Sequence, residues 1–221
     1  MRFINSRSRK WLLRYWDFPL FASALNAYGV SLQGMKILDA GCGSGYTLNL
    51  IWERFRPAVL DAFDIVPSQV EAARRRGTPT HVFQADITAL QLPSDSYDAV
   101  FVCGVLHHCG EWRRGVAEVA RVLRSGGVLL LEEPDVAHLR FERVLTGRSP
   151  ALQTGFSLRA LVEEMRLSGL QDISHRSLYF GLFGSLLCVK GAAAVNRHYA
   201  VLRAYRAADP AALARGHEMP A

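Results

Sequence analysis

Lys36 to Gly45 reads KILDAGCGSG, and this stretch decides the fold. A short apolar run that ends in glycines is typical of a buried parallel strand followed by a tight loop. Glycine lets the backbone of such a loop approach a ligand closely, and the following helix attracts negative charge at its N-terminus. The spacing G-x-G-x-G differs from the G-x-G-x-x-G of many dinucleotide sites. Asp39, just before the loop, suits a ligand with an amino group.

Alternating strand and helix patterns continue from this loop towards the C-terminus. Besides the strand at 36–40, we expect strands at 59–64, 81–84, 97–103 and 128–132, and helices at 46–55, 67–76, 111–123 and 157–167. Two further apolar runs, 173–179 and 184–190, are joined by a short link and predict a closing hairpin. This alternation is typical of an α/β fold with a doubly wound parallel sheet and right-handed crossovers.

Length and composition fit one α/β domain. The chain has 221 residues, of which 50% are hydrophobic and 21% are charged, as in ordinary globular domains. We expect a helical, basic and aromatic extension over 1–33, the main domain over 34–190, and a helical or flexible tail over 191–221. The four cysteines are scattered, so we expect reduced thiols, a cytoplasmic location and no metal site. We expect neither a membrane span nor a secretory signal.

The formal charge of +6 is concentrated in the two tails. Residues 1–16 carry five basic side chains and no acidic one, whereas residues 17–190 carry 17 basic and 18 acidic side chains. A nucleic-acid groove usually needs a basic face on the body of the domain. We therefore expect no nucleic-acid partner.

Acidic residues follow the second and third expected strands. Asp64 ends the second strand, 19 residues after Gly45, where an acid can accept two hydrogen bonds from a ribose diol. Asp86 follows the third strand and could accept a hydrogen bond from an adenine amino group, with Ile87 as an apolar wall. An acid at a strand end can also be a capping residue, so neither position is decisive alone.

Five segments in order resemble the signatures of a known family: 37–50 (ILDAGCGSGYTLNL), 63–68 (FDIVPS), 85–88 (ADIT), 97–108 (YDAVFVCGVLHH) and 120–131 (ARVLRSGGVLLL). They look like the class I S-adenosylmethionine-dependent methyltransferases, and most like the broad group that contains quinone-biosynthesis and small-molecule enzymes. The resemblance implies a Rossmann-like seven-stranded sheet of order 3-2-1-4-5-7-6, with strand seven antiparallel. It implies S-adenosyl-L-methionine as the cofactor.

The resemblance also implies a role for each matching position. Asp39 and the three glycines of the loop would hold the methionine part, Asp64 the ribose, and Asp86 with Ile87 the adenine. Two residues at the end of the fourth strand would line the methionine and the reacting methyl group. The expected cofactor-binding residues are Asp39, Gly41, Gly43, Gly45, Asp64, Ile65, Asp86, Ile87, Cys103 and Gly104.

His107 and His108 lie just beyond the fourth strand, at the edge where ligands bind in such sheets. One of them would be a general base or would orient the acceptor, since imidazole titrates near neutral pH. Alternatively, the pair packs and caps the helix that follows. Three acids after the fifth strand, Glu132, Glu133 and Asp135, face the same edge and would either bind a polar acceptor or form a solvated turn.

The expected activity is methyl transfer to a small lipophilic or aromatic molecule by in-line displacement. Residues 136–145 read as a short helix and lead into the loop 146–156, which would cover the pocket, with Tyr179, Phe180 and Phe183 nearby. These residues could equally fill the core. Two other functions stay open: an RNA or protein methyltransferase, and a non-catalytic partner subunit that binds the cofactor. The sequence also leaves open whether the chain forms a homodimer.

The basic N-terminal segment is interleaved with aromatic residues, and between Trp11 and Trp16 apolar side chains nearly encircle a helix. Three interpretations remain. The segment could cover the cofactor cleft as a lid, make peripheral contact with an anionic membrane, or pack as a core helix. The lid is our preferred expectation, because the segment precedes the first strand.

Overall fold

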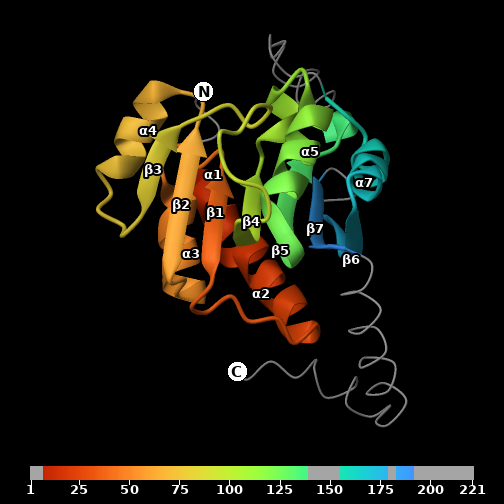
Figure 1. Cartoon of the computed structure of the whole chain (residues 1–221), viewed down its shortest axis with the longest axis horizontal. Helices are drawn as coiled ribbons and strands as arrows, with labels where there is room; N and C mark the ends of the chain where they lie inside the picture. Colours follow the sequence, from red (N-terminus) through yellow and green to blue (C-terminus); the bar gives the residue numbers. More distant parts are fainter. Residues whose placement is uncertain (1–6, 139–154, 179–182, 192–221) are drawn as a thin grey trace.

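The computed structural model describes residues 7–138, 155–178 and 183–191. Its centre is a seven-stranded sheet of order β3-β2-β1-β4-β5-β7-β6 (Figure 1). The first five strands are parallel, and β7 runs antiparallel between β5 and β6. This confirms the expected strand order and the antiparallel seventh strand. The bounds are β1 (Lys36–Ala40), β2 (Val59–Asp64), β3 (His81–Gln84), β4 (Tyr97–Cys103), β5 (Leu123–Pro134), β6 (Leu170–Leu178) and β7 (Phe183–Lys190).

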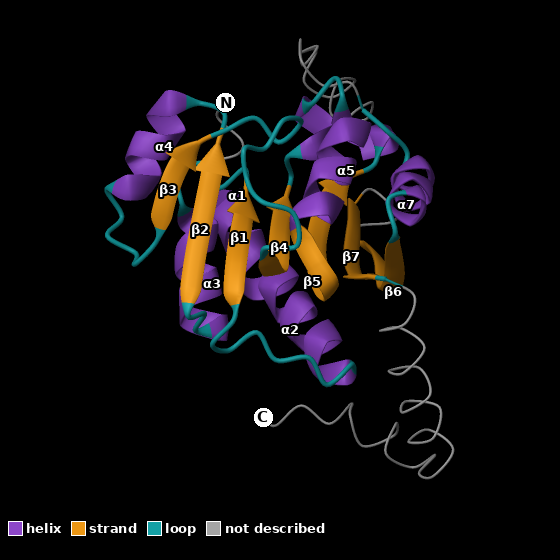
Figure 2. Ribbon diagram, in the orientation of Figure 1, coloured by secondary structure: helices purple, strands orange, loops and turns teal. Residues whose placement is uncertain are grey.

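Helices cover both faces of the sheet (Figure 2). One face is covered by α2, α3 and α4, and the other by α5 and α7. This distribution is that of a doubly wound sheet with right-handed crossovers. The bounds are α1 (Arg7–Leu12), a π-helical turn η1 (Leu13–Asp17), α2 (Phe18–Ala27), α3 (Tyr46–Phe55), α4 (Pro67–Arg74), a 3₁₀ turn η2 (Leu106–His108), α5 (Trp112–Val122) and α7 (Leu158–Leu167).

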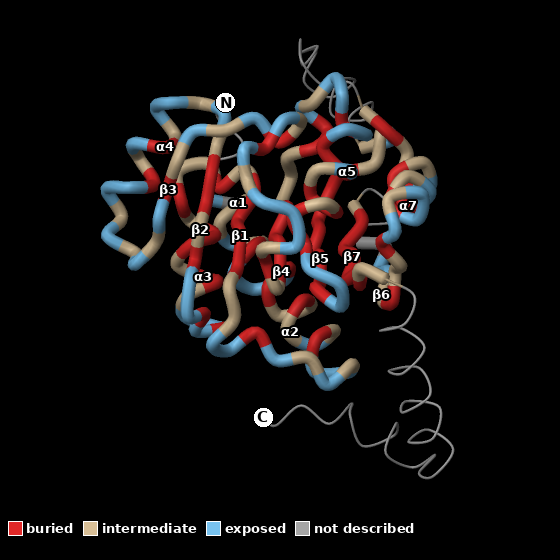
Figure 3. The backbone as a smooth tube through the Cα atoms, viewed as in Figure 1, coloured by how far each residue is buried: buried red, intermediate tan, exposed pale blue. Residues whose placement is uncertain are grey.

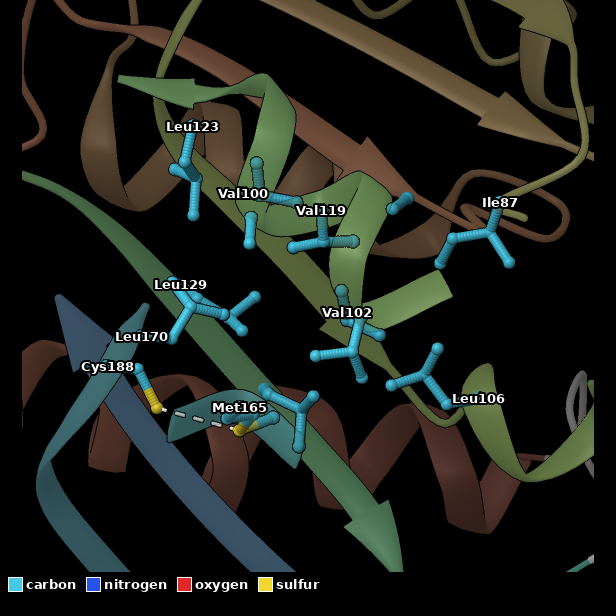
Figure 4. Packing of buried hydrophobic residues seen from close by; sticks show 14 of the residues in the cluster. Ile87, Val100, Val102, Leu106, Val119, Leu123, Leu129, Met165, Leu170 and Cys188 are labelled. Carbon is cyan, nitrogen blue, oxygen red and sulfur yellow. Dashed lines mark hydrogen bonds between the residues drawn. The ribbon is translucent and has the colours of Figure 1, made fainter. Parts of the chain in front are cut away.

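The core lies in two layers, one on each face of the sheet. Aliphatic side chains fill the layer under α5 and α7, where Val119, Leu129 and Met165 meet (Figure 4). Buried residues concentrate in the central strands, as the red segments of Figure 3 show. Because both faces of the sheet are covered, its strands are near-continuous hydrophobic runs, which is why they were visible in the sequence.

The opposite layer is rich in phenylalanine and includes the N-terminal helices. Phe18 stacks on Phe101 of β4 with ring centroids 5.8 Å apart, and Phe21 and Phe55 pack around the same ring. Leu13 of η1 is buried in this layer too. The helices from η1 onward therefore pack on the sheet. The division of the chain at residue 33 stays a prediction.

Several expected boundaries differ from the observed ones. The strand expected at 128–132 begins earlier, at Leu123, and its register with β4 jumps from the pair Tyr97–Leu123 to the pair Ala99–Val128. The helix expected at 157–167 begins at Leu158, and Ser157 is its N-cap, which accepts a hydrogen bond from the Ala160 amide. The helix expected at 136–145 is described only at 136–138. The loop 146–156 is described only at its last two residues, and Tyr179, Phe180 and the tail beyond 191 lie outside the described residues.

Candidate functional site

The glycine loop follows β1 and is held by its neighbours. Gly41, Gly43 and Gly45 all have positive φ, a conformation that favours glycine. A Cβ atom on Gly41 would lie only 2.5 Å from Cγ2 of Val105, just beyond β4, so the loop also needs glycine for space. The amide of Gly41 donates to the Phe63 carbonyl at 2.9 Å, which ties the loop to β2.

Asp39 lies at the end of β1, beneath this loop. Its side chain is buried, 1% exposed, and accepts a hydrogen bond from the Thr47 hydroxyl in the first turn of α3. Burial raises the pKa of Asp39 to about 7; the Thr47 bond opposes this shift, and the Asp64 charge adds to it. The site thus contains a buried acid that a cationic ligand would stabilise in its ionised form.

Asp64 ends β2 and organises the loop backbone. One carboxylate oxygen accepts the Gly43 amide at 2.8 Å, and the other accepts the Val66 amide at 2.9 Å. A carboxylate has about four lone-pair positions, so each oxygen keeps room for a further donor. Ile65 is 58% exposed beside it.

Asp86 and Ile87 follow β3. Asp86 is exposed, and one of its oxygens accepts both the amide and the hydroxyl of Thr88 at 2.8 Å. Ile87 is 4% exposed and belongs to the core layer under α5. Their roles at an adenine ring stay predictions, because the Asp86 carboxylate already accepts the backbone amide of Thr88 and so also acts within its own turn.

Gly104, at the end of β4, lies between two side chains that carry chemistry. A Cβ atom at this position would lie 3.5 Å from a guanidinium nitrogen of Arg9 and 3.7 Å from Cε1 of His107. The Gly104 amide donates to the Glu132 carbonyl at 2.7 Å. Burial raises the pKa of the adjacent Cys103 thiol well above its usual range, so this thiol is not a nucleophile at neutral pH.

Arg9 is a residue of the site that sequence reasoning missed. Its guanidinium pairs with Glu132 at the end of β5 and with Asp17 at 3.3 Å. Burial opposes the Arg9 charge, but the two carboxylates outweigh it and raise the pKa of Arg9. Burial and the nearby Glu132 charge raise the pKa of Asp17 to about 7. Within the sequence, Arg9 was one of five basic residues in a tail, and nothing local distinguished it.

Glu133 also proved to be buried, at 0% exposure. It accepts the amides of Val105 and Leu106, each at 2.7 Å, and contacts Nδ1 of His107 at 2.7 Å. The expectation of a solvated turn is therefore wrong for Glu132 and Glu133. Asp135 accepts the amides of Ala137 and Leu158 and so organises the chain before α7.

The two histidines differ. His107 is buried and held by Glu133, whereas the exposed His108 packs against it with ring centroids 3.9 Å apart. Partial burial and the neighbouring His107 lower the pKa of His108 to about 4, so His108 is neutral at physiological pH. The side-chain hydrogen bond of His107 goes to Glu133 and not to α5. No side chain caps the N-terminus of α5 at Glu111.

Two surface hollows lie away from these strand ends. One, of about 480 Å³, is lined by Thr88–Pro93 and α5, and the other, of about 580 Å³, lies between α2 and the C-terminal end of α3. We place the candidate site at the strand ends, because the acids, the glycine loop and His107 converge there. In the described ranges, no group of three or more potential ligand side chains is placed to hold a metal ion, and no helix is long and apolar enough to cross a bilayer.

Comparison with known proteins relates this chain to methyltransferases. Residues 38–131 match the family described as methyltransferase domain. The malonyl-[acyl-carrier protein] O-methyltransferase of Serratia marcescens is 37% identical over 46% of this chain and 39% of its own length. A chloroplastic 2-methyl-6-phytyl-1,4-hydroquinone methyltransferase of rice is 28% identical over 54% of this chain and 35% of its own length. The chain thus spans less than half the length of these curated relatives.

A solved structure supports the fold. The S-adenosylmethionine-dependent methyltransferase from Clostridium acetobutylicum superposes with a TM-score of 0.67, over 85% of this chain and 94% of that one, at 12% identity. At this identity the likeness shows the fold alone. The family match implies S-adenosyl-L-methionine as the cofactor.

Proposed function

We propose that this chain is a class I S-adenosylmethionine-dependent methyltransferase that transfers a methyl group to a small lipophilic or aromatic molecule. The observation that carries the proposal is the buried, acidic floor of the glycine loop, where Asp39 lies beneath Gly41 and Gly43 at the carboxyl end of β1.

The charge of this floor fits the cofactor. S-adenosylmethionine carries an ammonium and a sulfonium group, so a pocket for it needs acidic side chains that are not already neutralised. Asp39 makes no ion pair with any basic side chain in the described part of the chain, and its one side-chain partner there is the Thr47 hydroxyl. Its raised pKa reflects burial of a carboxylate without a cation. An ammonium group above the loop would relieve that cost.

The remaining contacts follow from the loop geometry. Asp64 already holds the Gly43 and Val66 amides, and its free lone pairs would accept the two ribose hydroxyls. Because Gly41, Gly43 and Gly45 carry no side chains, the ligand would approach the backbone of the loop closely.

Methyl transfer needs chiefly a nucleophile held in line. When bound, the cofactor supplies an activated methyl group for in-line displacement. The chain supplies position, which can contribute ~7–11 kcal/mol. In our proposal the acceptor lies above Gly104, between Arg9 and His107. His107 would take a proton from a hydroxyl or acidic carbon of the acceptor through Nε2, because Glu133 occupies Nδ1.

One relative supports the acceptor class. It is named for a phytyl hydroquinone, which is lipophilic and aromatic, whereas another relative is named for a malonyl group on an acyl carrier protein. Residues 17–190 carry 17 basic and 18 acidic side chains, a balance that does not favour a nucleic-acid partner. A small lipophilic acceptor is consistent with both observations.

A turnover assay tests the proposal. The full chain is incubated with methyl-labelled S-adenosylmethionine and a metabolite extract, and S-adenosylhomocysteine and the distribution of label are measured. We expect S-adenosylhomocysteine to form and label to enter the organic phase, with the Asp39→Asn variant as the control. Label confined to precipitated RNA or protein would contradict the proposal. So would a chain that binds the cofactor without turnover, since that is a partner subunit.

A further inference from the structure

The helical segment from Arg7 to Asp17 has two distinct sides. Leu13 and Asp17 are buried, and the guanidinium of Arg9 reaches Glu132 at the site. On the other side, Trp11, Tyr15 and Trp16 are 56%, 60% and 46% exposed. Tyr15 and Trp16 lie in the π-helical turn η1, whose buried residues are Leu13 and Asp17.

Exposed aromatic side chains of this kind are concentrated in one place. Six large apolar side chains are exposed in the described ranges: Trp11, Tyr15, Trp16, Val59, Ile65 and Leu167. Half of them, and all the aromatic ones, lie within six consecutive residues. Trp11 and Tyr15 pack together with ring centroids 5.6 Å apart, so they form one surface.

The charged side chains within residues 7–16 are all basic. Arg7 and Arg14 are exposed at helical spacing from Trp11, and Lys10 lies between them. Residues 7–16 contain no acid, and Asp17 points into the molecule. The acid that contacts the row is Glu53, which pairs with Arg14 at 3.2 Å, both side chains being about half exposed. Such a pair is weak in water and leaves the basic excess in place.

We propose that the aromatic and basic row, formed by Arg7, Trp11, Arg14, Tyr15 and Trp16, binds the surface of an anionic lipid membrane. Tryptophan and tyrosine have an apolar body and a polar tip, and they prefer the interface between lipid headgroups and hydrocarbon. Arginine adds attraction to anionic headgroups. Tryptophan, tyrosine and arginine are also enriched at protein interfaces, so the test below must distinguish membrane binding from self-association.

The aromatic and basic row lies on the same helical segment as Arg9, which contacts the candidate site. The same helix contacts the membrane with its outer side and the end of β5, beside Gly104, with Arg9 on its inner side. A lipophilic acceptor could therefore reach the site from the bilayer. This route for the acceptor rests on the proposed function, whereas the membrane contact itself does not.

Vesicle co-sedimentation of the full chain tests the contact without turnover. The probes are vesicles of phosphatidylcholine alone and of phosphatidylcholine mixed equally with phosphatidylglycerol. We expect binding to the mixed vesicles that weakens with added salt, and little binding to phosphatidylcholine. The Arg7→Gln/Arg14→Gln variant should bind about 25-fold more weakly, from about fivefold for each charge. The Trp11→Ser/Tyr15→Ser variant should also lose most binding.

Matched variants control for charge and exposure. Arg54→Gln/Arg75→Gln makes the same change in net charge at exposed positions on α3 and just after α4, and Leu167→Ser removes a side chain that is 77% exposed on α7. Both should bind as the wild type does. Equal binding to both vesicle types, equal losses in the controls, or a dimer that the Trp11→Ser/Tyr15→Ser variant dissociates without vesicle binding would each overturn the proposal. If one test variant fails to fold, the other decides.

Discussion

Arg9 and Glu132 lie 123 positions apart in the chain and form a buried ion pair. The pair joins the first helix to the carboxyl end of β5, and Asp17 shares the same guanidinium at 3.3 Å. The N-terminal segment is therefore fixed against the site from its inner side. Both the lid and the core-helix interpretations of this segment are compatible with that contact.

Replacing Arg9 with alanine should destabilise the protein. It would leave two buried carboxylates without a cation, and breaking a buried pair in this way typically costs about 3–5 kcal/mol. Arg14→Ala is the matched control, because its pair with Glu53 is exposed and should be worth less than about 1 kcal/mol. Urea denaturation of both variants measures the difference. Equal losses would show that the Arg9 pair contributes no more than a surface contact.

Asp64→Ala should weaken S-adenosylmethionine binding by about ten- to a hundredfold, the usual effect of losing one hydrogen bond to a charged group. The substitution also removes the acceptor for the Gly43 and Val66 amides, so the loop should become less ordered. Calorimetry on the folded variant measures the affinity. An unchanged dissociation constant would remove Asp64 from the binding site.

Cofactor affinity should depend on pH through Asp39, whose pKa burial raises to about 7. A carboxyl group with a raised folded-state pKa favours folding at acidic pH, and this contribution is lost as pH rises from its unfolded value of 3.8 towards 7. Binding of an ammonium group needs the ionised form. We therefore expect affinity to rise about fivefold between pH 6 and pH 7, and the Asp39→Asn variant to lose this dependence. A flat profile in the wild type would contradict the assignment.

His107→Asn should lower turnover by about 10²- to 10⁴-fold and leave cofactor affinity nearly unchanged, if His107 is the base. His108→Asn is the control, because partial burial lowers the pKa of His108 to about 4 and so makes it a weak base, and the hydrogen bond to Glu133 in the described structure belongs to His107. Steady-state kinetics on the true acceptor compare the two. Activity within a few-fold of wild type in both variants would leave methyl transfer dependent on positioning alone.

The central sheet could be predicted because its signals are local. The bounds of β1, β2, β3 and β4 match the expected ranges, and Asp39 and Asp64 lie at the carboxyl ends of neighbouring strands, as expected. Because helices cover both faces of the sheet, its central strands are hydrophobic runs in the sequence. Glycine and proline residues mark the turns between them.

The missed features depend on contacts between distant segments. No local pattern separates Arg9 from its four basic neighbours, since its partner Glu132 lies on another strand. Glu133 reads as a surface acid until the loop after β4 brings the Val105 and Leu106 amides to it. The start of β5 at Leu123 was missed because a Ser-Gly-Gly sequence usually forms a turn outside a strand. Here residues 125–127 lie within β5, at the point where its register with β4 shifts.

Calorimetric titration of the full chain with S-adenosylmethionine tests the central claim most directly, with NAD⁺ as the comparison ligand. The glycine loop, Asp39 and Asp64 predict saturable binding of one S-adenosylmethionine per chain and no binding of NAD⁺, because the loop is matched to an amino group and not to a pyrophosphate. A folded chain that fails to bind S-adenosylmethionine, or that binds NAD⁺ in its place, would contradict the account.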